Sequence, residues 1–436
     1  MMRLTEQAKA IMARNWRDGF TVPTDKLYPF QWNWDSGFAA MAFSHYDLDK
    51  GIQELQSLFS GQWQNGMLPH ILFHSEKETT YFPNFDFWEC WVNPGAPNKP
   101  KTSGITQPPV HGFAIEHMLD QHPDSEKLKG FIKELFPKII AYHQFLYTHR
   151  DPNQEKLFFI YHPWESGRDN SPIWDESLER IVIEPGSLPD YKRRDTSIAD
   201  AEERPTQQQY DRYVYLVELG KKHRYEGPGI AAESPFLLQD CMMNAILIAS
   251  NQSLLRIANR LGIDPGPLPE WIQEGRKNFH DKFWNNSIGQ YATYDLRGEY
   301  LIQHREIGGL VALFAEIPDE RNSAQLAVYL QQLSNRGYLL CPSFDVESPL
   351  FDSKRYWRGP VWPHMNWLIA KGLVKYGYDQ LADQLKNDLL LLVDQLGFYE
   401  YYEAEKSKIS QLDRGYGGAH FTWTATIILN FLEGNS

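Results

Sequence analysis

The segment DQLADQLKNDLLLLVDQLG, residues 379–397, decides the fold class. Its apolar residues recur at intervals of three and four, which is the spacing of one face of an α-helix. The segment FLLQDCMMNAILIASNQSLLRIANRLG, residues 236–262, shows the same pattern. Each segment ends in a glycine, Gly262 or Gly397, and glycine commonly terminates a helix. Both segments therefore predict long amphipathic helices.

The same periodicity extends through most of the 436-residue chain. It predicts helices over residues 5–16, 37–46, 50–61, 110–121, 125–149, 207–223, 236–262, 267–284, 304–316, 320–335, 361–377, 379–396 and 421–433. Strand signals are few, with one hairpin expected over 288–302. No Gly/Ser-rich linker divides the chain. We therefore expect an all-α fold in a single domain over residues 1–436, an (α/α)6 barrel or toroid, with a two-domain helical stack as the competing arrangement.

Two stretches, 75–109 and 165–206, lack helical periodicity except for one short helix near 174–180. Irregular segments of this length inside a compact domain are usually functional loops or disordered linkers. Their aromatic content argues against disorder. We expect them to form the rim, or lid, of a site.

Charge and aromatic content limit the classes of ligand. The formal net charge is −13, which disfavours nucleic acids and anionic membranes as partners. An anionic substrate would need a local cationic pocket. The 14 Trp, 23 Tyr and 24 Phe suit stacking on sugar rings, although a large helical core also absorbs aromatics. We expect a small-molecule ligand, and the sequence leaves a homo-oligomer open.

Cysteine usage and the N-terminal residues predict a cytoplasmic location. The three cysteines, Cys90, Cys241 and Cys341, are far apart and odd in number, which fits a reducing compartment. The first residues contain no apolar signal region, and no apolar run is long enough to span a membrane. Metal-ligand spacings are absent as well, so no metal or cofactor is expected.

The motif Trp164-Glu165-Ser166-Gly167-Arg168-Asp169 places two carboxylates, a guanidinium and an indole within six residues. A glycosidase needs one carboxyl that stays protonated near neutral pH, and burial or a neighbouring negative charge provides this. By composition alone, such a cluster is more often a structural ion pair in a loop.

Four other motifs combine aromatic residues with groups that could carry chemistry. In residues 31–38, QWNWDSGF, Asp35 fits either a helix N-cap or a sugar-binding carboxylate. Residues 355–367 are RYWRGPVWPHMNW, where Trp357 is expected to face a pocket, and residues 397–402 are GFYEYY around Glu400. Residues 417–425, GGAHFTWTA, open the last predicted helix. A lone histidine such as His420 is more often a capping or packing residue than a catalyst.

Together and in this order, these motifs change the interpretation. The elements W-E-S-G-x-D, W-x-W-D-S, Y-W-R-G-P-x-W and F-x-W-T-A resemble the (α/α)6 enzymes of glycoside hydrolase family 63, over residues 15–430. The length of the chain is most similar to that of the mannosylglycerate and glucosylglycerate hydrolases of this family. The resemblance implies an inverting hydrolase of a small α-glycoside.

The resemblance also assigns roles to residues. It implies that Asp169 is the general acid and Glu400 the base. The positions that match the sugar pocket are Trp32, Trp34, Asp35, Gln107, Trp164, Trp357 and Trp362. Those that match the glycerate site are Arg204 and Tyr210, with Tyr28, Tyr81 and Tyr356 as secondary pocket residues. His420 stands where the family has a glutamine, and the turn at 402–406 also departs from the family pattern.

Arg204 has a second interpretation, a salt bridge to Glu202 or Glu203. Three functional alternatives also remain at this stage. A neutral α-glucoside could replace the glycerate-containing substrate, and Arg204 distinguishes the two. A sugar epimerase would rely on histidine acid–base pairs, which the carboxylate motifs disfavour. A sugar-binding protein without catalysis has no need of both Asp169 and Glu400.

Overall fold

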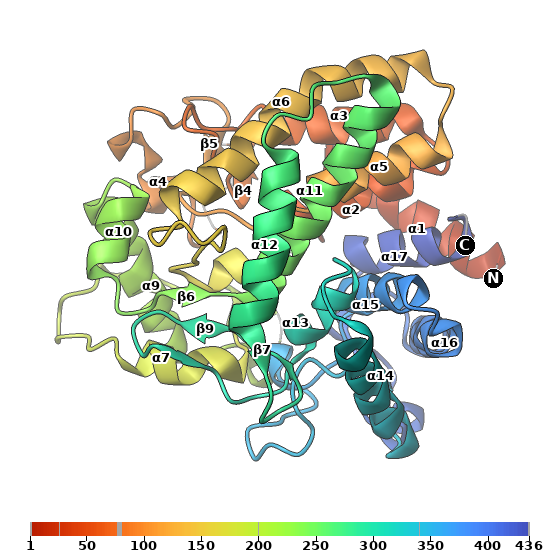
Figure 1. Ribbon diagram of the computed structural model, residues 1–436. Coiled ribbons are helices and arrows are strands. Elements are labelled where there is room, and N and C mark those ends of the chain that lie inside the picture. The colour runs from red at the N-terminus through yellow and green to blue at the C-terminus, as the bar shows by residue number, and fades with distance from the viewer. Residues whose placement is uncertain (1, 26, 76–80, 199, 340, 435–436) are drawn as a thin grey trace.

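The computed structural model describes residues 2–25, 27–75, 81–198, 200–339 and 341–434 (Figure 1). Residues 76–80 and 199 of the two predicted rim segments lie outside this description. Among the described residues, no helix is long and apolar enough to cross a membrane.

The helices alternate along the chain between an inner and an outer ring. The inner ring consists of α2 (Asn33–Ser44), α5 (His111–Gln121), α11 (Cys241–Leu261), α13 (Ile307–Leu310) with its 3-10 continuation η5 (Val311–Leu313), α15 (Pro363–Lys375) and α17 (Thr422–Leu432). The outer ring consists of α1 (Met2–Asn15), α3 (Leu48–Phe59), α6 (Glu126–His149), α12 (Leu268–Phe283), α14 (Glu320–Asn335) and α16 (Asp379–Leu396).

The inner ring is closed. Each inner helix contacts the next one along the chain, and α17 packs against α2 and α1, as Figure 1 shows for the two ends of the chain. Helix α2 is buried on all sides, as expected of an inner helix, whereas α16 buries a single stripe from Leu381 to Leu396. The predicted (α/α)6 fold is confirmed, and the two-domain helical stack is wrong.

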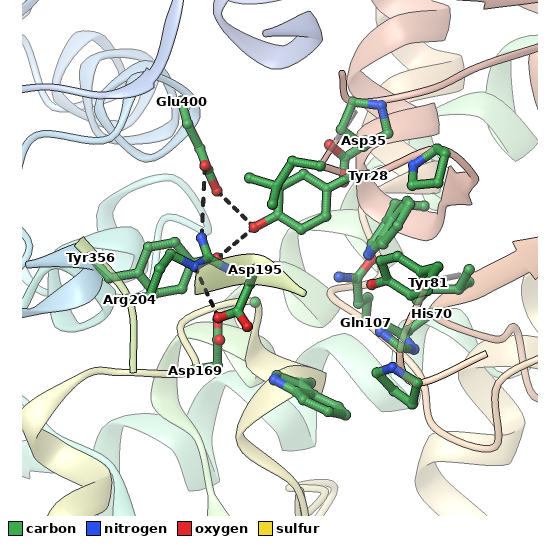
Figure 2. A pocket seen from close by; sticks show the side chains of 18 of the residues that line it. Tyr28, Asp35, His70, Tyr81, Gln107, Asp169, Asp195, Arg204, Tyr356 and Glu400 are labelled. Carbon is green, nitrogen blue, oxygen red and sulfur yellow. Dashed lines mark hydrogen bonds and ion pairs between the residues drawn. The ribbon is translucent and has the colours of Figure 1, made fainter. Parts of the chain in front are cut away.

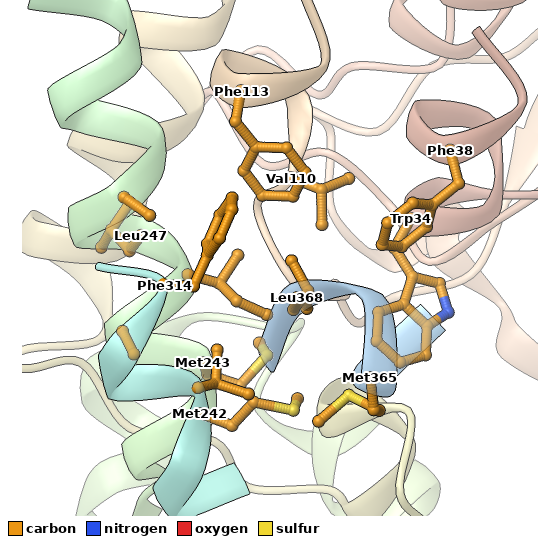
Figure 3. Packing of buried hydrophobic residues seen from close by; sticks show 14 of the residues in the cluster. Trp34, Phe38, Val110, Phe113, Met242, Met243, Leu247, Phe314, Met365 and Leu368 are labelled. Atoms are coloured by element: carbon orange, nitrogen blue, oxygen red, sulfur yellow. The ribbon is translucent and has the colours of Figure 1, made fainter. Parts of the chain in front are cut away.

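Apolar side chains fill the middle of the ring. Figure 3 shows Phe38, Phe113, Leu247, Phe314 and Leu368 meeting there. The first three and Leu368 come from α2, α5, α11 and α15, and Phe314 directly follows η5. The close approach of α2 and α5 depends on Gly37 in α2. A Cβ atom at this position would lie 2.4 Å from a methyl group of Val110, the residue before α5. The core thus lies along the ring axis.

Further helices and short strands connect the two rings at one end. The helices are α4 (Phe85–Trp88), α7 (Asp175–Glu179), α8 (Asp195–Ile198), α9 (Gln207–Lys222) and α10 (Gly227–Glu233). The strands form five small antiparallel sheets in the described part of the chain: β1 (Trp16–Arg17) with β2 (Phe20–Thr21); β3 (Gln31–Trp32), β4 (Ile71–Phe73) and β5 (Lys101–Thr102); β6 (Leu238–Gln239), β9 (Tyr294–Asp295) and β10 (Tyr300–Leu301); β7 (Trp284–Asn285) with β8 (Gln290–Tyr291); and β11 (Tyr399–Tyr401) with β12 (Tyr416–Ala419).

Several predicted boundaries are wrong because tertiary strand pairing overrides the helical pattern. The predicted helix 236–262 starts only at Cys241, since residues 238–239 pair as β6 with β9. The predicted hairpin 288–302 is two hairpins, one of β7 with β8, which starts before the predicted range, and one of β9 with β10. The short helix expected near 174–180 is present as α7. Helix α2 starts at Asn33, four residues earlier than predicted.

A buried ion network ties the loop before Asp169 to two inner helices. The Arg168 guanidinium forms a salt bridge with Asp240, at 2.7 Å, and a second with Glu306. Asp240 accepts the backbone N–H of Met242 at the start of α11, and Glu306 accepts that of Gly308 at the start of α13. Carboxylates are favourable at helix N-termini, so Arg168 joins two capped helix ends.

Replacing Arg168 with methionine should destabilise the fold strongly. It leaves two buried carboxylates without a cation, which costs about 3–5 kcal/mol of unfolding free energy. The matched control is Arg256→Met, because Arg256 pairs with Glu116 at the surface with its side chain 48% exposed, and such pairs contribute at most about 1 kcal/mol. Urea titration of both variants measures the difference. Equal losses would show that the buried network is not special.

Candidate active site

One cavity lies at the N-terminal ends of the inner helices (Figure 2). It encloses about 1060 Å³, including its open mouth. Apart from Trp357, Trp362 and His420, every predicted site residue lines it: Tyr28, Trp32, Trp34, Asp35, Tyr81, Gln107, Trp164, Asp169, Arg204, Tyr210, Tyr356 and Glu400. These residues come from separate regions of the chain, and the closed ring brings them together.

The structure does not place Trp357, Trp362 and His420 on the cavity wall. Trp357 and Trp362 stack on each other at 3.7 Å and are fully buried, with Trp362 also stacked on Tyr401. Both indoles therefore support the wall from behind. His420 is exposed in a left-handed turn (φ 53°), and its carbonyl oxygen accepts a hydrogen bond from Asn15. It occupies a tight turn before α17.

Asp169 follows a fixed turn. Gly167 has φ +70°, and a Cβ there would lie 2.4 Å from the Trp34 indole, so glycine is required for this close approach. The Tyr213 hydroxyl donates to the Asp169 carbonyl oxygen. Burial raises the pKa of the Asp169 carboxyl to about 7, and Glu400 adds to this, while Arg204 opposes it. Asp169 is thus a carboxyl group that can hold a proton near neutral pH.

The interpretation of the motif as a structural ion pair is also correct, but it applies to Glu165 and Arg168 and not to Asp169. Glu165 pairs with buried Arg150 at 3.1 Å, and Arg168 pairs with Asp240 and Glu306. Asp169 takes part in neither pair. The pairs hold the loop, and the remaining carboxyl faces the cavity.

Glu400 lies in the middle of β11, opposite an irregularity in β12. Tyr401 pairs with Tyr416 and Tyr399 with Ala419, so β12 has one more residue than β11 between the two pairs. The Gly418 N–H donates to Glu400 Oε2 (3.0 Å) and the Tyr28 hydroxyl donates to Oε1 (3.2 Å). Burial raises the pKa of Glu400, and Arg204, the Gly418 N–H and Tyr28 oppose this rise.

Arg204 lies between the two carboxyl groups in Figure 2. Its guanidinium stacks on the Tyr356 ring at 4.3 Å, and its acidic neighbours are Asp195 (Nε to Oδ2, 3.4 Å) and Glu400 (Nη1 to Oε2, 3.9 Å). The alternative of a salt bridge to Glu202 or Glu203 is therefore wrong. Nη1 is buried and has no hydrogen-bond partner among the described residues. This nitrogen is suited to bind an anion.

Asp35 lies inside the first turn of α2, so its interpretation as an N-cap is wrong. The N-cap position is Trp32, without a side-chain cap, because α2 already begins at Asn33. Burial raises the pKa of Asp35 to about 8, and the charges of Glu400 and Glu54 contribute. Its Oδ1 atom is buried without a hydrogen-bond partner in the described structure. A neutral carboxyl of this kind can exchange hydrogen bonds with sugar hydroxyls.

Sequence reasoning missed other residues on the wall, including His70, Asp195, Phe421 and Trp423. Trp423 was contained in the quoted F-x-W-T-A motif, which could have identified it. Asp195 lies within the predicted rim 165–206, in the short helix α8, and no local pattern marks it. In the described ranges, no group of three or more histidine, cysteine, aspartate or glutamate residues is arranged to hold a metal ion.

An (α/α)6 ring with a protonatable buried carboxyl and a second carboxylate in one aromatic cavity is an arrangement suited to glycoside hydrolysis. Residues 28–424 match the family described as the mannosylglycerate hydrolase MGH1-like glycoside hydrolase domain. The chain belongs to this family and is a glycoside hydrolase.

Individual relatives agree with this assignment. The chain is 41% identical to a mannosylglycerate hydrolase of Thermus thermophilus, over 97% of the chain and 99% of the relative. It is 30% identical to the glucosylglycerate hydrolase of Mycolicibacterium hassiacum, over 99% and 98%. The crystal structure of a GH63 mannosylglycerate hydrolase from Thermus thermophilus, in complex with Tris and D-glycerate, superposes with a TM-score of 0.91 at 40% identity, covering 98% of this chain and 99% of that one.

The pKa of Asp169 predicts a pH limit on activity. A pKa raised to about 7 keeps the proton on Asp169 below that pH, and above it the protonated fraction falls tenfold per pH unit. For an O-glycoside, kcat/KM should therefore decline above about pH 7, as initial rates across pH 5–9 will measure. A glycosyl fluoride, whose leaving group needs no proton, is the control. The same decline with the fluoride would assign it to another group, such as Asp35.

Proposed function

We propose that this enzyme hydrolyses an α-glycoside of glycerate, glucosylglycerate or mannosylglycerate, to the free sugar and glycerate with inversion. The observation that carries the proposal is the presence of Asp169, Glu400 and the buried Arg204 in one cavity. The names of the relatives support this substrate class.

Asp169 donates its proton to the glycosidic oxygen. The group must be protonated at neutral pH, and its burial supports this role. Loss of the proton leaves an aspartate near Arg204, whose positive charge stabilises the anion.

Glu400 removes a proton from the attacking water. It must be ionised, and the contacts from Tyr28, Gly418 and Arg204 favour the charged form. In Figure 2, Glu400 and Asp169 lie on opposite sides of the Arg204 guanidinium. Inversion requires the two carboxyl groups to be about 6.5–9.5 Å apart, so that a water fits between the base and the sugar.

Arg204 anchors the glycerate carboxylate. A guanidinium with a free N–H matches a carboxylate and would form a charge-assisted hydrogen bond. The site also explains how a protein with a net charge of −13 could bind an anion. Tyr210 also lines the cavity, and the Arg193 guanidinium lies over its ring at 4.4 Å from the ring centre.

We further propose that the enzyme acts in the cytoplasm, on a small molecule and not on nucleic acid. The three cysteines are all unpaired and buried, which fits a reducing compartment.

Two isosteric variants test the chemistry. Asp169→Asn and Glu400→Gln should each lower kcat by about 10²- to 10⁴-fold, because each removes one proton-transfer group. Thermal midpoints should change little. Proton NMR of the wild-type reaction should show the β-anomer of the sugar first. Appearance of the α-anomer first, or near-normal turnover by either variant, would contradict the mechanism.

Arg204→Met tests the substrate class. It should lower kcat/KM for the glycosylglycerates about 100-fold, since a charge-assisted hydrogen bond is lost, and lower it much less for a neutral methyl α-glycoside of the same sugar, on which only the influence of Arg204 on Asp169 and Glu400 is lost. The control Arg355→Met removes a partly exposed cation that does not line the cavity, lies 3.9 Å from Asp352 and donates to the backbone carbonyl oxygen of Glu202. An equal loss on the neutral glycoside would favour the neutral α-glucoside as the natural substrate class.

A further inference from the structure

Glu203 is a buried carboxylate directly before Arg204, and it does not line the cavity. Its side chain is 1% exposed. Oε1 accepts a hydrogen bond from Arg414 Nη2 (2.9 Å) and Oε2 accepts the backbone N–H of Gly417 (2.9 Å). Both partners lie more than 200 residues further along the chain, Arg414 just before β12 and Gly417 at its start. Glu203 therefore contacts β12, the strand that pairs with the strand carrying Glu400.

The region of β12 that Glu203 holds is a bulge. The extra residue of β12 falls between the pairs Tyr401–Tyr416 and Tyr399–Ala419, opposite Glu400. Gly417 is in the left-handed region, with φ +69°, as in bulges that begin with a glycine. A Cβ atom at Gly417 would lie 2.3 Å from Glu400 Oε2, so the backbone there approaches the carboxylate as closely as only glycine permits.

Two consecutive N–H groups of this bulge bind two different carboxylates. The Gly417 N–H is held by Glu203, and the next one, the Gly418 N–H, donates to Glu400 Oε2 at 3.0 Å. These N–H groups belong to two successive peptide planes that meet at the Cα atom of Gly417, so the φ and ψ of Gly417 set the angle between them. Glu203 holds the first plane, and the pairs Tyr401–Tyr416 and Tyr399–Ala419 hold the strand on both sides of the bulge, which together restrict the direction of the Gly418 N–H. Glu203 in this way orients the donor that holds Glu400.

The rim segment is bound to β11 at a second point. The Tyr401 hydroxyl donates to the backbone carbonyl oxygen of Glu203 at 2.9 Å, and Tyr401 directly follows Glu400. Glu203 is thus attached to both strands around Glu400. The next residue, Arg204, contacts Glu400 itself at 3.9 Å.

We propose that Glu203 is a positioning residue that fixes Glu400 and Arg204 in a common frame, so that recognition of the substrate anion and activation of water depend on one support. This inference rests on the roles proposed for Arg204 and Glu400. Glu203 touches neither substrate nor the reacting atoms. A misplacement of about 1 Å in such a frame is enough to slow a reaction about 10- to 100-fold.

The two hydrogen bonds that Glu203 accepts, from Arg414 and from the Gly417 N–H, require a carboxylate at this position. Both of its partners are donors, and both carboxylate oxygens accept. A glutamine of the same shape would present an NH₂ group to one of them. Glu203→Gln therefore breaks one contact without creating a cavity, and the ion pair with Arg414 is lost.

The experiment compares two substrates of the same sugar, the glycosylglycerate and the α-glycosyl fluoride. The fluoride needs the base Glu400, but it has no carboxylate for Arg204 to bind and no leaving group that Asp169 must protonate. For Glu203→Gln we expect KM for the glycosylglycerate to rise and kcat to fall on both substrates, by about tenfold on the fluoride. Arg414→Gln, at a side chain that is 42% exposed, should give a smaller effect of the same kind. The control Glu202→Gln, 73% exposed and paired with Lys354, should leave both substrates within about twofold of wild type.

The outcomes are distinguishable. A fluoride kcat that is unchanged in Glu203→Gln would overturn the link to Glu400. A proportional fall of both kcat values at constant KM, matched by a lower fraction of folded protein in thermal unfolding, would reduce Glu203 to a structural role. If wild-type enzyme hydrolyses the fluoride but no glycosylglycerate, the proposed substrate is wrong, and the fluoride data still test the positioning of Glu400.

Discussion

The site depends on the buried charge of Arg168. This guanidinium is fully buried and lies against two carboxylates that cap neighbouring inner helices, α11 and α13. Removing a charge from water is expensive unless its partners are well placed, so the loop that carries Arg168 has few alternative positions. The loop is therefore held in place by the two inner helices to which Arg168 is bound. Asp169, the next residue, is fixed at the cavity although it lies in an irregular segment.

The same network explains how one short motif contains both paired and unpaired acids. Glu165 and Arg168 have buried partners of opposite charge, whereas Asp169 is in no salt bridge of the described structure, and the charge of Arg204 only partly offsets the effect of its burial. Burial then raises the pKa of Asp169, because desolvation without a close cation disfavours the anion. A structural ion pair and a catalytic acid are not competing interpretations of such a motif. The paired charges create the environment in which the third group stays protonated.

The sequence predicted those features that local patterns encode. Helix periodicity predicted most helices of both rings, and the motif order predicted that Asp169 and Glu400 belong to one site, where the cavity brings them together. It did not predict the bulge opposite Glu400 or the role of Glu203, because these contacts join residues about 200 positions apart through strands of three or four residues. Strands this short carry no periodic signal. Trp357 was expected in the pocket because it precedes a predicted helix and matches a sugar-pocket position of the family, but its stacking on Trp362 could be recognised only in three dimensions.

Arg204 connects the binding of the substrate with the state of the acid. Its charge lowers the pKa of both Asp169 and Glu400, against the effect of burial. A carboxylate bound to its guanidinium would neutralise part of that charge and weaken this effect. The pKa of Asp169 would then rise in the complex, which retains the proton that the leaving group needs. Glu400 keeps two further contacts that favour its ionised form, from Tyr28 and the Gly418 N–H. In the proposed mechanism, the bulge N–H thus helps Glu400 to stay charged, while the bound substrate keeps Asp169 protonated.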